Sequence, residues 1–525
     1  MLHVIRIIWE GNMKKQTLIK GTLILGIASV LAKFLGLFFR IPLQMLIGDE
    51  GMGYYQMSYP LYITFAAVAS GIPIAISKII SEMGSKNDTG GIRYVFKATL
   101  KIMIPFALIF STVMIVFGKN IISFLRWDMK SYYAFLAISI APILVVIMGA
   151  FRGFFQGLQN MNPTAVSQVL EQLGRVVFGV GLAYLLIGKG IDYAAGGAAL
   201  GAVAGGIMCI IYLFFTYMKV AKGVPKRPVR DKKSIVKRII ITAVPFSLGA
   251  VIGTIMGLVD SIVVPRQLLA AGFSTQNAAI LYGQLTGKAG TISNVPLSLS
   301  MALCASLVPI IAETFFRKDS KELGNKVENA MKLSAVIALP SAMGIFCLAY
   351  PIVNLVFAGD YGGYDLLRYV SLSIPFIILC QTTTSILQAM NNFYKPVKNL
   401  AIGCVVKVIL TYVLVGMPNI NIYGAIIGSI AGYLVTCTLN LVALKKVLIV
   451  PVNYYETIVK PGFATVIMGI SVIFTYNSAL RVMGSVNLAC LASVFVGMII
   501  YLIFIVIFKV FKYSDIKKKI RKGSI

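Results

Sequence analysis

The sequence predicts an all-α membrane protein that crosses the bilayer about fourteen times. Hydrophobic residues make up 58% of its 525 residues and charged residues only 13%, whereas a soluble domain has roughly 45–50% apolar and about 25% charged residues. Apolar stretches long enough to span a bilayer, about 20 residues each, recur from Thr17 to Lys509. No segment between them is long enough to fold as a separate aqueous domain, so the membrane is the solvent for nearly the whole chain.

Each predicted helix is an apolar stretch that ends at charged, glycine or proline residues. Several stretches exceed the length of a single crossing, so we expect those helices to tilt or to protrude from the bilayer. Twelve crossings with two re-entrant segments is the alternative. The helices are expected near residues 17–47, 54–82, 93–118, 131–156, 164–187, 193–218, 237–270, 277–315, 325–357, 363–390, 397–417, 421–446, 456–478 and 484–511.

The distribution of the +30 net charge predicts the orientation. Connections that follow odd-numbered helices carry little positive charge, except the third, which holds Lys119, Arg126 and Lys130. Even-numbered connections and both termini are basic, above all residues 219–238 and 512–522. The positive-inside rule then places both termini in the cytoplasm and the protein in the cell membrane, which requires an even number of helices.

Two sequence patterns occur twice. Gln156–Pro163 (QGLQNMNP) returns as Gln388–Pro396 (QAMNNFYKP), and glycines 197, 201 and 205 return as glycines 424, 428 and 432. They predict two six-helix lobes in a pseudo-two-fold repeat around a central cavity, a transporter design with its site between the halves. Two additional C-terminal helices lie outside the repeat.

This repeat divides the chain into segments. We expect translation to start at Met13, because Trp9-Glu10-Gly11 requires purine-rich codons that resemble a ribosome-binding site. The expected segments are residues 1–12 as a mis-annotated or disordered start, 13–218 as the N-terminal lobe, 219–236 as a basic cytoplasmic linker, 237–447 as the C-terminal lobe, 448–511 as the two additional helices and 512–525 as a basic tail.

Basic residues inside the predicted helices are the first candidates for function, because each costs roughly 2.5–3.5 kcal/mol at the bilayer centre. Lys33 and Arg40 share one face of the first helix, and Arg175 returns at the repeat offset as Lys407. Lys288 has no acidic residue nearby in the sequence, which favours a position facing a cavity. Such cations bind an anion, or a packed carboxylate neutralises them; Arg in particular suits the oxygens of a phosphate.

Acidic residues inside the predicted helices are fewer than basic ones. Glu171 lies one helical turn before Arg175 and is expected to pair with it or to balance its charge. Asp260 and Glu313 are candidates for a coupling ion, and Asp260 could instead neutralise an inward lysine. Lys78 and Glu82 are predicted to form a pair at the end of the second helix.

Several function classes are excluded. The cations cluster at helix ends without the interleaved aromatic residues of a nucleic-acid surface. His3 is the single histidine, and the seven cysteines lie inside apolar runs, so we expect no metal, disulfide or cofactor. External loops too short for a catalytic domain argue against an enzyme. A transporter for an anionic cargo remains, with an ion-coupled exporter of drugs or cations as the alternative.

The motifs of the first two helices resemble a known family. They are Leu35–Leu43 (LGLFFRIPL), Ile47–Gln56 (IGDEGMGYYQ), Tyr59–Tyr62 (YPLY) and Gly71–Lys78 (GIPIAISK), joined later by Leu281–Gly287 (LYGQLTG) and Ser306–Glu313 (SLVPIIAE). They are similar to the polysaccharide-transporter family of stage V sporulation protein B. This family is related to the MurJ-type lipid II flippases and the multidrug (MATE) exporters of the MOP superfamily.

The resemblance implies a flippase for an undecaprenyl-pyrophosphate-linked precursor of cell-wall or spore-cortex peptidoglycan, working by alternating access. In MurJ-type proteins, cations of helices 1, 2 and 8 hold the lipid pyrophosphate; Lys33 and Arg40 match helix 1, and Lys78 and Lys288 match the other two more loosely. We expect a monomer surrounded by membrane lipids and acting beside cell-wall synthesis proteins. Transport could draw on Na⁺, H⁺ or the membrane potential.

Overall fold

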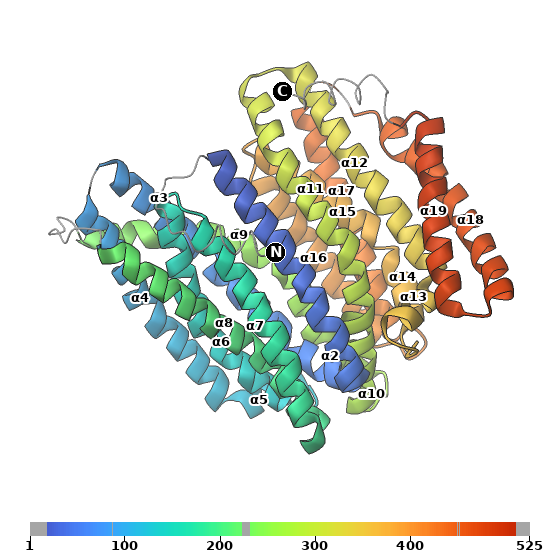
Figure 1. The fold of residues 1–525 in the computed structure, drawn as a ribbon, viewed down its shortest axis with the longest axis horizontal. Helices are drawn as coiled ribbons and strands as arrows, with labels where there is room; N and C mark the ends of the chain where they lie inside the picture. Colours follow the sequence, from blue (N-terminus) through green and yellow to red (C-terminus); the bar gives the residue numbers. More distant parts are fainter. Residues whose placement is uncertain (1–17, 87, 223–231, 449, 451, 511–525) are drawn as a thin grey trace. The chain divides into compact units, whose positions relative to one another are not determined.

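The computed structural model describes residues 18–86, 88–222, 232–448, 450 and 452–510. The predicted start at residues 1–12, the basic tail and the central part of the basic linker lie outside these ranges. Regular structure in the described residues is helical throughout, and the chain divides into two compact units between Gly283 and Gln284 (Figure 1). The all-α prediction is therefore confirmed.

The first unit contains α2 to α10. A long element leads from the first predicted helix into the second and is broken at Gly48, whose φ of 66° is open to glycine at little cost. The helices are α2 (Leu18–Ala69), α3 (Gly71–Ser85), α4 (Thr89–Val116), α5 (Gly118–Leu125), α6 (Tyr132–Gly157), α7 (Asn162–Leu186), α8 (Ile191–Lys222), α9 (Lys232–Ala270) and α10 (Thr275–Gly283), with short 3₁₀ turns at Met129–Ser131 and Ile187–Lys189.

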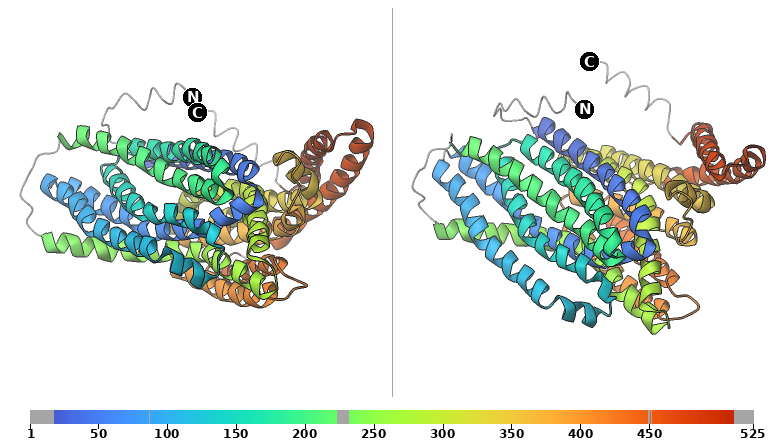
Figure 2. Two further views of the ribbon diagram at one scale, coloured as in Figure 1. Left: turned by 90° about the horizontal axis from the view of Figure 1, so that it is seen from below. Right: turned by 60° about the horizontal axis from the view of Figure 1, so that its bottom comes forward.

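The second unit begins with a π-helix and ends with two helices that pack side by side, α18 and α19 (Figures 1 and 2). α18 also packs against α12, and Tyr501 of α19 donates a hydrogen bond to the Val336 carbonyl at 3.1 Å. The elements are the π-helix η3 (Gln284–Ala289), α11 (Gly290–Phe316), α12 (Ser320–Cys347), α13 (Ala349–Val356), α14 (Tyr364–Ser371), α15 (Ile374–Ala389), α16 (Tyr394–Val415), α17 (Tyr423–Val447), the π-helix η4 (Tyr455–Val459), α18 (Lys460–Met483) and α19 (Val486–Ile507).

Eleven helical stretches of the described residues are long and apolar enough to cross a membrane, or twelve if α14 and α15, bent by 43°, form one span. One of the eleven, Ile24–Ser85, holds both of the first two predicted helices. The protein is thus a multi-pass membrane protein, and fourteen crossings remain a prediction.

The first unit continues beyond the predicted lobe boundary at residues 219–236. α9 packs against α2, α3 and α4, and α10 packs against α2. At the α2–α10 contact the backbones approach so closely that a Cβ atom on Gly53 would lie 2.0 Å from the Ala279 carbonyl oxygen. The packing therefore groups α9 and α10 with the first unit, and the lobe boundary at residues 219–236 remains a prediction.

The two predicted repeats contain the same kind of helix crossing, each within its own unit. α8 packs on α7, and α17 packs on α16. A Cβ atom on Gly205 would lie 2.3 Å from the Glu171 carbonyl oxygen, and one on Gly432 would lie 2.8 Å from the Gly403 carbonyl oxygen. These residues correspond to one another at the predicted offsets, so the packing agrees with a duplication.

A candidate anion-binding site on the first unit

Arg175 occupies the centre of a polar cluster between α7 and α2. Its side chain is buried, and its guanidinium donates hydrogen bonds to the hydroxyl oxygens of Tyr59 at 2.9 Å and Tyr62 at 3.0 Å. Glu171 accepts a longer contact from Arg175 at 3.5 Å, which confirms the pair predicted from their spacing. The tyrosines thus hold this guanidinium more closely than the carboxylate does.

The Glu171 carboxylate is shared with a second arginine, Arg152 of α6. Arg152 Nη2 lies 2.8 Å from Glu171 Oε2, and Arg152 Nε donates to Ser167 Oγ at 2.9 Å. Tyr62 donates its hydroxyl proton to Glu171 at 3.4 Å. One buried carboxylate therefore balances two guanidinium groups, which leaves a net positive charge in the cluster.

The Tyr59 ring connects this cluster to Arg40. The centre of the ring lies 5.8 Å from the Arg175 guanidinium carbon and 5.7 Å from that of Arg40. Tyr55, Tyr59 and Tyr62 are spaced by four and three residues, which places them on one face of α2. Neighbouring rings stack at 5.3 and 5.8 Å. An aromatic face attracts a cation, so this stack holds the half-buried Arg40 beside the buried cluster.

Lys33 lies on the same helix as Arg40. Seven residues are about two turns of an α-helix, so the two side chains point to nearly the same side of α2. Lys33 is exposed on the surface of the protein and Arg40 is half-buried. Both predicted cations of the first helix are therefore accessible to a ligand, in contrast to Arg175.

The predicted cations of the second unit, Lys288 and Lys407, are both buried. Lys288 belongs to the π-helix η3 and is completely buried; its ammonium group lies 2.8 Å from Asp360 and 5.8 Å from the centre of the Phe357 ring. Asp360, distant in the sequence, is brought to it by folding, and a cavity-facing role of Lys288 stays a prediction. Lys407 is 2% exposed, on the face of α16 that meets α17.

Amide and hydroxyl groups form a hydrogen-bond network near Lys407 in the second unit. Asn440 Nδ2 donates to Thr384 Oγ1 at 3.1 Å, and Asn399 Nδ2 donates to Asn440 Oδ1 at 2.9 Å. At the repeat offset, Thr384 corresponds to Arg152 and Asn399 to Ser167. Amides and hydroxyls thus join helices of the second repeat at the positions of Arg152 and Ser167, whereas Lys407 keeps one buried cation at the position of Arg175.

The predicted pair of Lys78 and Glu82 is wrong. Glu82 is ion-paired with Lys86 at 2.9 Å and with Arg238 of α9, and Lys78 is exposed on α3. The sequence missed Arg238 because it reaches α3 through the packing of α9.

The remaining predicted carboxylates belong to other helices than those of the cluster. Asp260 is half-buried on α9 of the first unit. Glu313 is exposed at the end of α11 in the second unit and lies 3.5 Å from Arg317, one turn away. A role of either residue in ion coupling stays a prediction.

Two parts of the cluster were missed by reasoning from the sequence. Arg152 lies in a highly apolar predicted helix, which is itself a signal for a functional or paired charge. Tyr59 and Tyr62 were noticed only as part of a family motif; their spacing placed both hydroxyls on one helix face. The sequence did not predict that Arg152 and Tyr62 both contact Glu171.

Two family models match parts of the chain. Residues 18–315 match the family model described as polysaccharide biosynthesis protein, which is more than half of the chain. The chain belongs to this family. Residues 286–413 also match the family model MatE.

Curated relatives cover nearly the same length. Stage V sporulation protein B of Bacillus subtilis (strain 168) is 29% identical over 515 residues, which are 96% of this chain and 98% of that protein. Lipid II flippase MurJ of the same organism is 27% identical over 455 residues, 82% of each chain. The protein is thus related to stage V sporulation protein B and to the MurJ flippases, and its family is one of transporters and not of enzymes.

Solved structures show the same fold. The inward closed conformation of lipid II flippase MurJ superposes with a TM-score of 0.71 at 16% identity, over 93% of this chain and 99% of that one. An inward-facing MATE multidrug transporter of the MOP superfamily gives a TM-score of 0.66 at 15% identity, over 82% and 97%. The predicted membership in this superfamily is confirmed.

Proposed function

We propose that the protein is a flippase that moves an undecaprenyl-pyrophosphate-linked glycan, a precursor of cell-wall or spore-cortex peptidoglycan, across the cell membrane by alternating access. The observation that supports this most directly is the surplus of guanidinium charge in the first unit: Arg152 and Arg175 share one carboxylate, Glu171, and Arg40 adds a third guanidinium over the Tyr59 ring. A cluster with this balance favours an anionic ligand.

Within the cluster, the residues have different tasks. Arg40 and Lys33 are accessible and form the first contact with the pyrophosphate. Arg175 holds Tyr59 through its hydroxyl group and so fixes the ring against which Arg40 lies. A side chain that is fixed before the ligand arrives loses less conformational entropy on binding. Lys78, Lys288 and Lys407 are further candidates along the path.

The proposed membrane topology has fourteen crossings with both termini in the cytoplasm. The stretch Ile24–Ser85 is long enough for two crossings and is broken at Gly48. The bent pair α14 and α15 supplies one crossing, and α9, at 39 residues, is long enough for another. Two six-helix lobes around a central cavity and two additional helices then follow from the repeat.

Complementation of a conditional lipid II flippase mutant tests the proposal. The unchanged protein should restore growth, and Lys33→Ala or Arg40→Ala should abolish it while membrane abundance stays the same. Arg40→Lys should retain part of the activity because it keeps the charge and loses the planar donor geometry. The matched control is Arg481→Ala, at an exposed arginine of α18. Full growth with both alanine variants would refute the assignment of this site.

An ion-coupled exporter of drugs or cations is the second candidate, favoured by the MatE match and by the fold shared with MATE transporters. Asp260 or Glu313 would then exchange the coupling Na⁺ or H⁺. The surplus of positive charge argues against a cationic cargo. Raised drug resistance on overexpression, without any effect on lipid-linked precursors, would favour the exporter over the flippase.

A further inference from the structure

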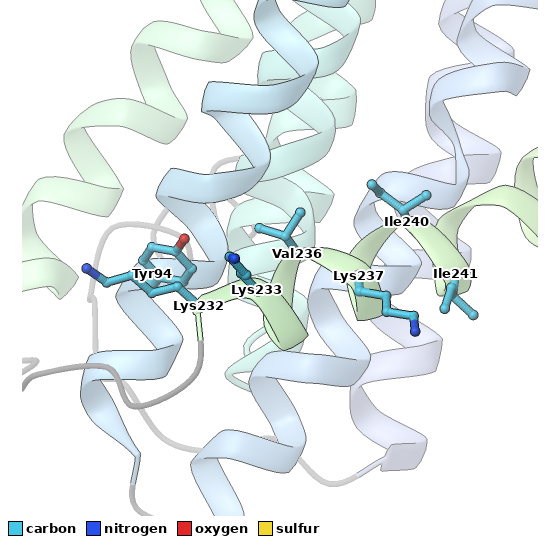
Figure 3. A pocket seen from close by; sticks show the side chains of 7 residues that line it. All are labelled: Tyr94, Lys232, Lys233, Val236, Lys237, Ile240 and Ile241. Carbon is cyan, nitrogen blue, oxygen red and sulfur yellow. The ribbon is translucent and has the colours of Figure 1, made fainter.

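A groove opens on the first unit between α4 and the first turns of α9 (Figure 3). Its volume is about 480 Å³. It lies on other elements than Arg175, which belongs to α7. The lining residues are Tyr94, Lys232, Lys233, Val236, Lys237, Ile240 and Ile241.

Basic and apolar side chains line the groove together, and Lys237 lies beside Ile241 (Figure 3). Six of the lining residues lie on α9 in adjacent pairs four positions apart, a spacing that keeps them on one side of the helix. Tyr94 and Lys232 lie together at one end, and Ile240 and Ile241 lie at the other (Figure 3). At 1.5 Å per residue, the two ends are about 13 Å apart. This length is comparable to a phospholipid headgroup with the upper part of its acyl chains.

The three lysines of the groove form no ion pair within the part of the chain that the structure describes. Arg238, the neighbouring cation, is paired with Glu82, whereas among the described residues no carboxylate lies within ion-pair distance of Lys232, Lys233 or Lys237. Lys232 lies 6.0 Å from the centre of the Tyr94 ring, a contact that positions its ammonium group without consuming its charge.

We propose that this groove binds one anionic phospholipid. The phosphodiester contacts Lys232 and Lys233, Lys237 adds positive charge farther along the bound lipid, and one acyl chain follows Val236, Ile240 and Ile241, which are half-buried or exposed in the protein alone. Basic residues at the end of a membrane helix attract anionic headgroups, and the apolar side chains extend the contact toward the hydrocarbon. A soluble phosphate would use the lysines alone and leave the isoleucines without a partner.

Native mass spectrometry of the purified full-length protein tests the lysines. The protein is incubated with phosphatidylglycerol or with phosphatidylcholine of the same acyl chains, and the bound lipid is counted. The variant Lys232→Gln, Lys233→Gln, Lys237→Gln should lose about fivefold or more of its bound phosphatidylglycerol, with bound phosphatidylcholine unchanged.

The control variant removes the same number of charges elsewhere. Lys395→Gln, Lys398→Gln, Lys445→Gln replaces three exposed lysines of the second unit and should change phosphatidylglycerol binding less than about twofold. Equal losses in the two triple variants would overturn the proposal, because binding would then follow net charge and not the groove.

The apolar end is tested separately, with all lysines in place. Ile240→Ser, Ile241→Ser should also lower bound phosphatidylglycerol several-fold, and glycerol phosphate should fail to displace the lipid. Unchanged binding in this variant, or displacement by glycerol phosphate, would overturn the proposed lipid in favour of a soluble phosphate. These exposed side chains are not needed for packing, so the double variant keeps the test valid if the lysine variant fails to fold.

Discussion

Replacing Glu171 by glutamine is the most direct test of the charge balance in the first unit. Glutamine keeps the size of the side chain and one acceptor oxygen, but it removes the negative charge that Arg152 contacts at 2.8 Å and Arg175 at 3.5 Å. Glu171 is 9% exposed and Arg175 is 5% exposed, so water can replace little of the lost interaction.

The expected cost follows from this geometry. Breaking a buried ion pair from one side lowers the free energy of unfolding by about 3–5 kcal/mol, because the remaining charge is left without compensation. Arg152 is partly accessible and glutamine can still accept one hydrogen bond, which places Glu171→Gln near the lower end, at about 3 kcal/mol. The free energy of unfolding is measured by chemical denaturation in detergent micelles.

A double-mutant cycle with Arg152→Gln separates the pair from its surroundings. The double variant should be more stable than the sum of the single losses predicts, by about 1–3 kcal/mol, because the two residues share one interaction. Glu456→Gln is the control: its pair with Lys460 is 2.6 Å long but partly exposed, so we expect at most about 1 kcal/mol. A loss below about 1 kcal/mol for Glu171→Gln, with additive behaviour in the cycle, would refute the view that this carboxylate neutralises two buried cations.

Two further variants probe packing and the second unit by the same denaturation assay. Gly53→Ala should lower the free energy of unfolding by about 1–3 kcal/mol or more, because the added Cβ meets backbone at 2.0 Å, whereas Gly181→Ala meets nothing within 4 Å and should be neutral or stabilising. Asp360→Asn removes the charge that faces the fully buried Lys288; because Asp360 is itself exposed, we expect about 1–3 kcal/mol, and a loss indistinguishable from zero would contradict a structural role of the pair.

Local patterns in the sequence predicted those features that depend on neighbours along one helix. Hydropathy predicted an all-α membrane protein, of whose fourteen helices eleven or twelve candidate spans are found among the described residues, and the four-residue spacing of Glu171 and Arg175 predicted their ion pair. The same spacing failed for Lys78 and Glu82, because Arg238 of a distant helix competes for that carboxylate. A spacing rule is reliable only where no other element brings a stronger partner.

Partners from distant segments could not be read from the sequence. Arg152 reaches Glu171 from α6, and Asp360 reaches Lys288 from the loop before α14. The division of the chain after Gly283 was equally hidden, since it depends on the close backbone contact between α2 and α10. Each of these features depends on which helices pack together, and hydropathy alone does not determine that.

The two repeats show that the charged cluster is not required by the helix crossing itself. The second unit joins α15, α16 and α17 through amide and hydroxyl groups at corresponding positions. Buried charges cost desolvation energy, and a neutral network of similar shape is often as stable. Because Lys407 keeps a buried cation at the position of Arg175 in the second repeat, Arg152 and Glu171 are the charges that this crossing does not need for packing.

Transplanting the second network into the first unit tests this argument. The variant Arg152→Thr, Ser167→Asn, Glu171→Gly, Arg175→Lys, Leu213→Asn copies Thr384, Asn399, Gly403, Lys407 and Asn440 of the second repeat. We expect a monodisperse protein of near wild-type abundance, with about 1 kcal/mol lost to the added helical glycine, that no longer supports flippase complementation. If growth were fully restored, the arginine cluster would be a structural device without a part in transport. If the variant failed to accumulate, the charged groups would be needed for folding, and the argument from the second repeat would be wrong.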